Sequence, residues 1–86
     1  MITVYKKPSC FACTKTIEKF EAAGLPVNVV DVTENPNALT YVKEDLGYLS
    51  APVVVVSEHD HWTGLRLDNI ERVIAGGGAD DETAGE

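Results

Sequence analysis

Short apolar runs, separated by polar and glycine-rich segments, predict the strands of this 86-residue chain. Each run is rich in β-branched residues, which favour extended structure. The most hydrophobic run holds four consecutive valines and is entered through Pro52, which is typical of a central strand. We expect strands at residues 2–6, 27–32 and 51–56, and a short strand or turn at 61–64.

Between these runs, apolar residues recur three and four positions apart, which places them on one face of a helix. The spacing predicts helices from residue 9 or 10 to about 23, from 35 to 47, and from about 67 to 75. Gly24 and Gly47 provide the stops for the first two. One face of each helix is expected to hold, in order, Cys13, Ile17 and Phe20; Leu39, Val42 and Leu46; and Ile70, Val73 and Ile74.

The predicted order of elements is β-α-β-α-β-β-α, which belongs to the α/β class. A strand, a crossover helix and a second strand give parallel pairing with a right-handed crossover, whereas the last two strands are close enough to pair antiparallel. We therefore expect one domain over residues 1–75, a four-stranded mixed sheet flanked by three helices. Residues 76–86 form an acidic, glycine-rich tail that we expect to be disordered.

The chain has 14 acidic and 7 basic residues and a net charge of −7. Nucleic acid is an unfavourable partner, because phosphate contacts require a basic surface. Three lysines, at positions 6, 7 and 15, flank the two cysteines of the chain. They either solvate a surface or lower a thiol pKa and attract an acidic partner segment, and the sequence leaves both readings open.

Membrane attachment is also not expected. No apolar stretch approaches the roughly 18 residues of a membrane-spanning helix. The first residues lack the basic-then-apolar layout of a signal peptide. We expect a cytoplasmic monomer with no membrane partner.

Cys10 and Cys13 carry the chemistry that the sequence predicts. Cys10 lies at the start of the first predicted helix, where backbone N–H groups and the helix dipole stabilise an anion. Cys13 lies one turn further on, within reach to close a disulfide. The loop between them is too short to stabilise the fold by cross-linking. A thiolate nucleophile beside a second thiol is a dithiol–disulfide exchange site.

The cysteine pair has two alternative interpretations, a metal site and a binding module without enzymatic activity. His59 and His61 could complete a metal site, but zinc fingers space their histidines three to five residues apart on a helix, and the chain has no second CxxC. We expect no metal and no cofactor besides a Cys10–Cys13 disulfide. A non-enzymatic binding module that kept a redox fold is the other reading, and the intact CxxC argues against it.

Three sequence blocks, in order along residues 2–75, resemble one family. They are Val4-Tyr5-Lys6-Lys7-Pro8-Ser9-Cys10 with Cys13, Leu46-Gly47-Tyr48-Leu49-Ser50-Ala51-Pro52-Val53-Val54, and His61-Trp62-Thr63-Gly64-Leu65-Arg66. A strand, a CxxC and a helix in this topology resemble the thioredoxin fold. Within that fold, the blocks are similar to the glutaredoxin-like NrdH-redoxin family. The third block is close to the Trp-Ser-Gly-Phe-Arg-Pro signature of that family, with Thr63, Leu65 and Leu67 as the departures.

The resemblance implies a function. Members of the family donate electrons to the large subunit of class Ib ribonucleotide reductase, and thioredoxin reductase recharges them. Glutaredoxins of the same fold use glutathione, held by a Gly-Gly-Cys-Asp-Asp type segment that opens the last helix. At that place this chain has Trp62-Thr63-Gly64-Leu65-Arg66 instead. Its glycine run, Gly76-Gly77-Gly78, comes after the last predicted helix and not before it. A glutaredoxin that depends on glutathione or another low-molecular-weight thiol is the alternative.

The resemblance also implies a set of residues that contact the partner. Pro52 is expected to be cis and to pack beside the cysteines, with the backbone of Ala51 pairing with a partner peptide as an added strand. Trp62 is expected to cover the core, to contact the partner, or both. Arg66 is expected to cap a helix, pair with an acid or contact the partner. The full set is Lys7, Phe11, Ala12, Ala51, Pro52, Trp62, Thr63, Gly64 and Arg66.

Overall fold

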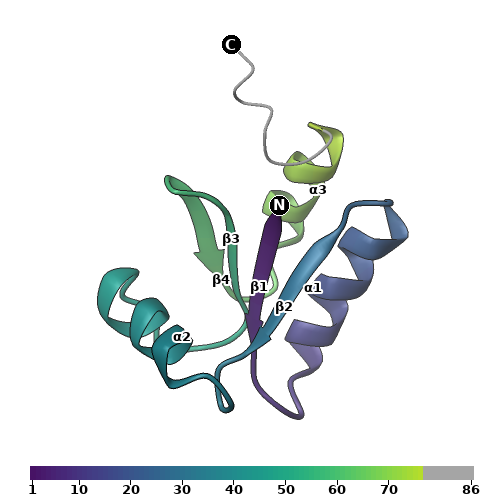
Figure 1. The fold of residues 1–86 in the computed structure, drawn as a ribbon. Coiled ribbons are helices and arrows are strands. Elements are labelled where there is room, and N and C mark those ends of the chain that lie inside the picture. The colour runs from purple at the N-terminus through teal and green to yellow at the C-terminus, as the bar shows by residue number, and fades with distance from the viewer. Residues whose placement is uncertain (77–86) are drawn as a thin grey trace.

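The computed structural model describes residues 1–76 of the chain, so the tail predicted for residues 76–86 lies outside the described residues except for Gly76. The elements follow the predicted order (Figure 1). Their bounds are β1 Ile2–Lys6, α1 Phe11–Ala22, β2 Val27–Asp31, α2 Pro36–Thr40, η1 Tyr41–Asp45, β3 Val53–Ser57, β4 Asp60–Thr63 and α3 Leu67–Ala75.

The strands form one mixed sheet in the order β2-β1-β3-β4, which confirms the predicted α/β fold. β1 pairs in parallel with β2, with Ile2 opposite Val27. β1 pairs antiparallel with β3, and β3 pairs antiparallel with β4. The β1–β3 register sets Tyr5 opposite Val53. The chain segments that leave β1 and enter β3 therefore meet at the same end of the sheet (Figure 1).

The core lies between the sheet and helices α1 and α3. Alternate residues of β1, Ile2 and Val4, point to this side, as the two-residue period of a strand requires. They pack in one cluster with Phe20 of α1 and Ile70 of α3. The complete buried cluster is Ile2, Val4, Phe20, Val54, Val56, Trp62, Ile70 and Val73. The opposite face of the sheet is covered by α2 and η1, where the rings of Tyr5 and Tyr41 lie 5.8 Å apart.

The helix predicted over residues 35–47 differs from the structure. It is divided into the α-helical turn α2 and the π-helical turn η1, in which the Leu46 N–H donates to the Tyr41 carbonyl oxygen five residues back. The wider turn changes the angular spacing of side chains. Val42 is buried, whereas Leu39 remains 38% exposed and Leu46 is half-buried. The three residues expected on one helix face therefore differ in burial.

The third strand also begins later than predicted, at Val53 instead of residue 51. The Ala51–Pro52 peptide bond is cis, as the resemblance implied. Pro52 consequently belongs to a loop that precedes the strand, and its ring is fully buried. This loop lies at the end of the sheet from which the chain continues to the cysteines.

Candidate functional site

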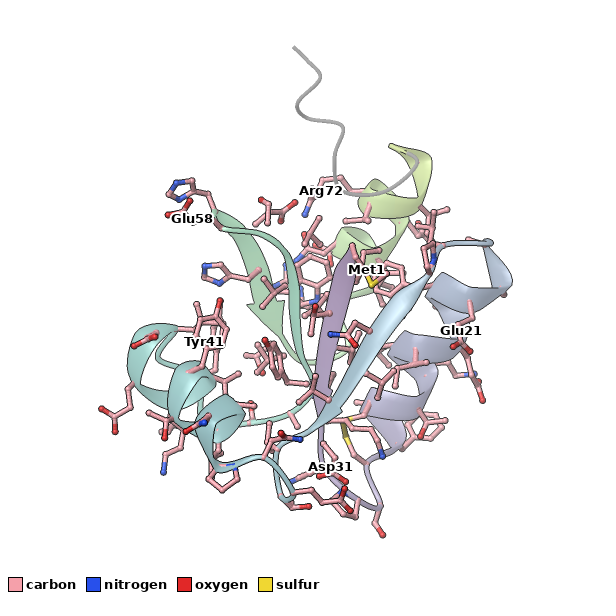
Figure 2. The ribbon with its side chains drawn as sticks, viewed as in Figure 1. Met1, Glu21, Asp31, Tyr41, Glu58 and Arg72 are labelled. Carbon is pink, nitrogen blue, oxygen red and sulfur yellow. A yellow bond between two sulfur atoms is a disulfide. The ribbon has the colours of Figure 1, made fainter. Side chains whose placement is uncertain are left out.

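Cys10 and Cys13 are joined by a disulfide, with Cα atoms 5.2 Å apart. The bond lies at the N-terminal end of α1, at the same end of the molecule as Asp31, the last residue of β2 (Figure 2). Both cysteines therefore stand where the prediction placed them, at the start of the first helix.

Cys10 is the N-cap of α1, one of the two residues predicted for that position. Its backbone is extended, with φ −112° and ψ 104°, and its Sγ accepts a hydrogen bond of 3.1 Å from the Cys13 N–H. Ser9 precedes it in the left-handed region, at φ 58°, which turns the chain sharply from β1 into the helix. The sulfur thus occupies the position of a capping oxygen, at the positive end of the helix dipole.

The two sulfur-bearing residues differ in exposure. Cys13 is 1% exposed on the core side of α1, whereas Cys10 is partly exposed. Lys7 lines two cavities, one of about 340 Å³ and one of about 320 Å³ that adjoins the cysteines. The cavity beside the cysteines is lined by Lys6, Lys7, Ser9, Cys10, Phe11, Cys13 and Thr14. Both cysteines line this cavity, and Cys10 is the more exposed of the two.

Lys7 and Phe11 of the predicted contact set both lie beside the disulfide. Phe11 is 73% exposed and lines the cavity beside the cysteines. The Lys15 Nζ lies 5.9 Å from the centre of the Phe11 ring and 4.0 Å from a Glu18 carboxylate oxygen. Among the ion pairs formed by residues 1–76, none involves Lys7. Its charge is therefore available at the mouth of the site.

The loop before β3 is held by β4. The Thr63 hydroxyl contacts the carbonyl oxygens of Ser50 at 2.8 Å and Pro52 at 3.0 Å. The Gly64 N–H donates to the same Pro52 oxygen at 2.9 Å, and Gly64 adopts φ 92°, which favours glycine. Thr63 and Gly64, which the sequence analysis assigned to the partner, thus brace the cis-proline loop, and their contact with a partner stays a prediction.

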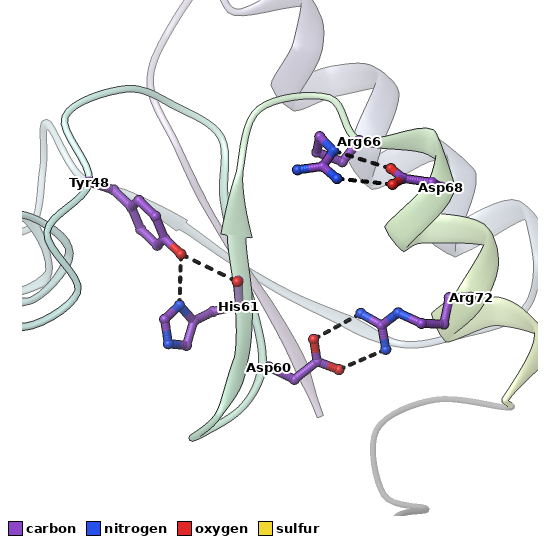
Figure 3. Close-up of polar contacts among 6 residues, drawn as sticks. All are labelled: Tyr48, Asp60, His61, Arg66, Asp68 and Arg72. Carbon is purple, nitrogen blue, oxygen red and sulfur yellow. Dashed lines mark hydrogen bonds and ion pairs between the residues drawn. The ribbon is translucent and has the colours of Figure 1, made fainter.

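Trp62 lies in the core, with 5% of its surface exposed. Its Nε1 has no hydrogen-bond partner among the described residues. The Arg72 guanidinium lies 5.9 Å from the ring centre and is held by two hydrogen bonds to Asp60, of 3.0 and 2.8 Å (Figure 3). Of the two readings of Trp62, the structure therefore supports coverage of the core. Because its ring is buried, Trp62 can affect a partner only by positioning the residues around it.

Arg66 pairs with an acid, the second of its three predicted roles. Its Nε and Nη2 donate to the two carboxylate oxygens of Asp68, at 3.2 and 2.9 Å (Figure 3). This contact lowers the pKa of the Asp68 carboxyl and raises the pKa of Arg66. Arg66 occupies the N-cap position of α3, but its side chain makes no capping hydrogen bond.

His59 and His61 are the two histidines that could complete a metal site with the cysteines. His61 lies on β4, and its Nδ1 is 2.9 Å from the Tyr48 hydroxyl (Figure 3). Within residues 1–76, no three His, Cys, Asp or Glu side chains gather as a metal site would require.

None of the helices that the structure describes has the length and the apolar composition of a membrane-spanning helix.

Thr16 is the residue that sequence reasoning missed. The predicted buried face of the first helix held Cys13, Ile17 and Phe20, whereas the structure buries Thr16 fully and Ile17 only in part. Thr16 follows Cys13 by three positions, so helical spacing alone could have placed it on that face. It was overlooked because a hydroxyl carries no hydrophobic signal.

Comparisons with known proteins agree with this geometry. The glutaredoxin family model matches residues 2–62. The Gene 56 protein of Mycobacterium phage L5 is 38% identical over 73 residues, which cover 85% of this chain and 71% of the phage protein. The glutaredoxin-like protein NrdH of Salmonella typhimurium is 31% identical, over 84% of this chain and 86% of its own. The structure of Escherichia coli NrdH-redoxin superposes with a TM-score of 0.76 and 29% identity, over 84% and 92% of the two chains.

Proposed function

The chain belongs to the glutaredoxin family, as an NrdH-type glutaredoxin-like protein, and is a thiol–disulfide oxidoreductase; from this premise we propose that it is the electron donor of a class Ib ribonucleotide reductase and that thioredoxin reductase recharges it. A cytoplasmic location is part of the proposal, because a dithiol that cycles requires a reducing compartment. So is a monomeric state.

One observation carries the assignment of roles within the site. The Cys13 N–H is directed at Cys10 Sγ, and Cys10 is the more exposed of the two residues. A hydrogen bond from a helix N-terminal N–H favours the thiolate over the thiol. Cys10 is therefore the nucleophile, and the buried Cys13 resolves the intermediate.

The reaction has two exchange steps. The Cys10 thiolate attacks one sulfur of the partner disulfide, a Cys10–partner bond forms, and the second partner sulfur leaves with the electron pair. Cys13, having given its proton to water, then attacks Cys10 Sγ. The Cys10–Cys13 bond forms, the partner leaves as a dithiol, and two electrons have passed to it. Thioredoxin reductase returns the protein to the dithiol state by the reverse chemistry.

The surface around the cysteines supports a peptide partner. The Thr63 hydroxyl of β4 donates to the carbonyl oxygens of Ser50 and Pro52, on either side of Ala51. Among the described residues, the N–H and C=O of Ala51 itself make no hydrogen bond. An extended peptide can add to these groups as a further strand. Phe11 and Ala12 between the cysteines, and Lys7 beside them, complete the proposed contact, with Lys7 favouring an acidic segment.

The choice of reductant rests on the start of α3. The segment that leads into it, Trp62-Thr63-Gly64-Leu65-Arg66, differs from the Gly-Gly-Cys-Asp-Asp type segment of glutathione-dependent glutaredoxins. The Arg66–Asp68 ion pair occupies the first turn. The E. coli relative is described as having a thioredoxin-like activity profile, which points the same way.

The glutathione-dependent alternative is favoured by the match to the glutaredoxin model, and a coupled assay separates the two. NADPH consumption is followed with thioredoxin reductase in one arm, and with glutathione and glutathione reductase in the other, using insulin as the disulfide substrate. We expect turnover with thioredoxin reductase to exceed turnover with glutathione by at least about tenfold. Equal rates would replace the proposed reductant by glutathione. Adding the purified class Ib reductase large subunit in place of insulin then tests the acceptor.

A further inference from the structure

Thr16 is the one buried polar residue among residues 1–76. It is 0% exposed on the core side of α1, and its Oγ1 has no hydrogen-bond partner in the described part of the chain. A buried hydroxyl without a partner destabilises a fold, and valine has the same shape without that cost. The position of Thr16 suggests a partner that exists in another redox state of the protein.

Cys13 is the neighbour that changes with redox state. It precedes Thr16 by three residues on the same helix and is 1% exposed, so the two side chains are adjacent on the buried face. In the structure, Cys13 Sγ is bonded to Cys10 and carries neither a proton nor a charge. In the reduced protein it is a thiol that has to ionise before it can attack.

We propose that Thr16 is a positioning residue for the resolving step, and that its hydroxyl donates a hydrogen bond to the Cys13 thiolate of the reduced protein and of the mixed disulfide. Burial disfavours a charged sulfur unless a donor faces it. The Cys13 N–H serves Cys10 instead, so a donor for Cys13 has to come from elsewhere. Thr16 supplies one from the next turn of the helix. The inference rests on the proposed roles of the two cysteines.

The step that Thr16 assists is the second exchange. Cys13 loses its proton to water, and the Thr16 hydroxyl stabilises the resulting anion. The thiolate then attacks Cys10 Sγ, the Cys10–Cys13 bond forms, and the bond between Cys10 and the substrate sulfur breaks, with the electron pair leaving on the substrate. The hydroxyl keeps its own proton throughout. Attack by Cys10 on the substrate does not involve Thr16.

The test separates the two exchanges. Reduced full-length protein is mixed in a stopped-flow instrument with one equivalent of dithiobis(nitrobenzoate), an aromatic disulfide that releases a coloured thiolate at each exchange. The first release reports attack by Cys10, and the second reports resolution by Cys13. In Thr16→Val we expect the first phase to be unchanged and the second to slow by about tenfold, the effect of losing one hydrogen bond to a charged group. Thr16→Ser should restore the second phase.

Three controls fix the interpretation. Thr40→Val removes a hydroxyl from the exposed side of α2 and should leave both phases unchanged. Cys13→Ser should show the first phase alone. The melting temperature of Thr16→Val should be no lower than that of the wild type, because the lost hydroxyl had no partner in the oxidised fold. An unchanged second phase in Thr16→Val, or equal slowing of both phases that serine does not restore, would overturn the proposal. A wild type that releases only one equivalent would instead overturn the cysteine roles on which it rests.

Discussion

Thr63 and Pro52 are joined at the end of the sheet by a hydrogen bond of 3.0 Å from the threonine hydroxyl to the proline carbonyl oxygen. The same hydroxyl lies 2.8 Å from the Ser50 carbonyl oxygen, so one proton is shared between two acceptors. The Ser50 hydroxyl, 3.1 Å away, can then donate to Thr63 Oγ1. A single β4 side chain thus spans the loop that contains the cis peptide bond.

Thr63→Val tests this contact. The valine keeps the shape of threonine but removes the donor to the Ser50 carbonyl and leaves the Pro52 carbonyl with the Gly64 N–H alone. We expect the free energy of unfolding to fall by about 1 kcal/mol. Because the loop is proposed to pair with a peptide, insulin reduction should fall more than reduction of dithiobis(nitrobenzoate). Urea unfolding and the two assays measure these effects. Thr63→Ser should behave like the wild type, and a valine variant of unchanged stability would show that the hydroxyl does not hold the loop.

The loss of folding stability at acid pH should depend in part on Asp31. The Thr33 hydroxyl, at 2.6 Å, and the Thr33 N–H, at 2.9 Å, donate to its Oδ1 and lower the pKa of the carboxyl. Since the folded pKa lies below the unfolded value of about 3.9, the stabilisation is fully present above that value. It is lost as the pH falls through the folded pKa.

Asp31→Asn should therefore lower the urea midpoint at neutral pH and have less effect well below the unfolded pKa. Urea midpoints of both proteins across the acid range measure the difference. Asp45→Asn removes a carboxylate that makes no hydrogen bond or ion pair among the described residues, and it serves as the matched control. If the two variants show parallel curves, the Thr33 contacts do not contribute to acid stability.

The fold could be predicted from the sequence where the spacing of apolar residues matches the residues that the core buries. The valine-rich strands and the α1 and α3 faces follow the periodicity of their apolar residues, and the structure places Phe20 and Ile70 in the core as expected. The prediction of one continuous helix over residues 35–47 failed, because a π-helical turn, η1, replaces the α-helix from Tyr41 to Asp45. Nothing in the apolar spacing distinguishes an α-helical from a π-helical turn of this length, because tertiary packing decides between them.

The candidate site was predictable to the extent that it is local. The position of Cys10 at the helix start follows from neighbouring residues alone, and the structure confirms it. The hydrogen bonds of Thr63 and Gly64 to Pro52 join residues eleven or twelve positions apart, and no short-range signal reveals them. Thr16 escaped notice because hydrophobic patterning cannot identify a polar residue that the fold buries.

Trp62→Phe separates partner coupling from thiol chemistry. The indole N–H has no partner among the described residues, so the variant loses ring volume and weakens the cation–π contact with Arg72 but loses no hydrogen bond. We expect the free energy of unfolding to fall by about 1–2 kcal/mol, as for other large-to-small core substitutions. Reduction of dithiobis(nitrobenzoate) by chemically reduced protein should persist, while turnover with thioredoxin reductase falls. Unchanged reductase turnover would leave Trp62 with a role in the core only.

The strongest prediction concerns which cysteine attacks. Cys10 is the partly exposed cap of α1 and accepts the Cys13 N–H, whereas Cys13 is 1% exposed. Thiolate character and access together select the attacking sulfur. Cys13→Ser should therefore still attack a partner disulfide and accumulate a stable mixed disulfide, because the resolving thiol is gone. Cys10→Ser should accumulate almost none.

Mass spectrometry of each variant, after incubation with oxidised class Ib reductase large subunit or with insulin, measures the mixed disulfide. As an independent measurement, iodoacetamide at slightly acidic pH should label Cys10 before Cys13 in the reduced wild type, because only an accessible thiolate reacts there. Labelling of Cys13 first, or efficient trapping by Cys10→Ser, would reverse the two roles. It would also mean that the hydrogen bond at the helix N-terminus does not determine which sulfur is the nucleophile. The buried Cys13 would then be the thiolate, although burial normally disfavours a charged sulfur.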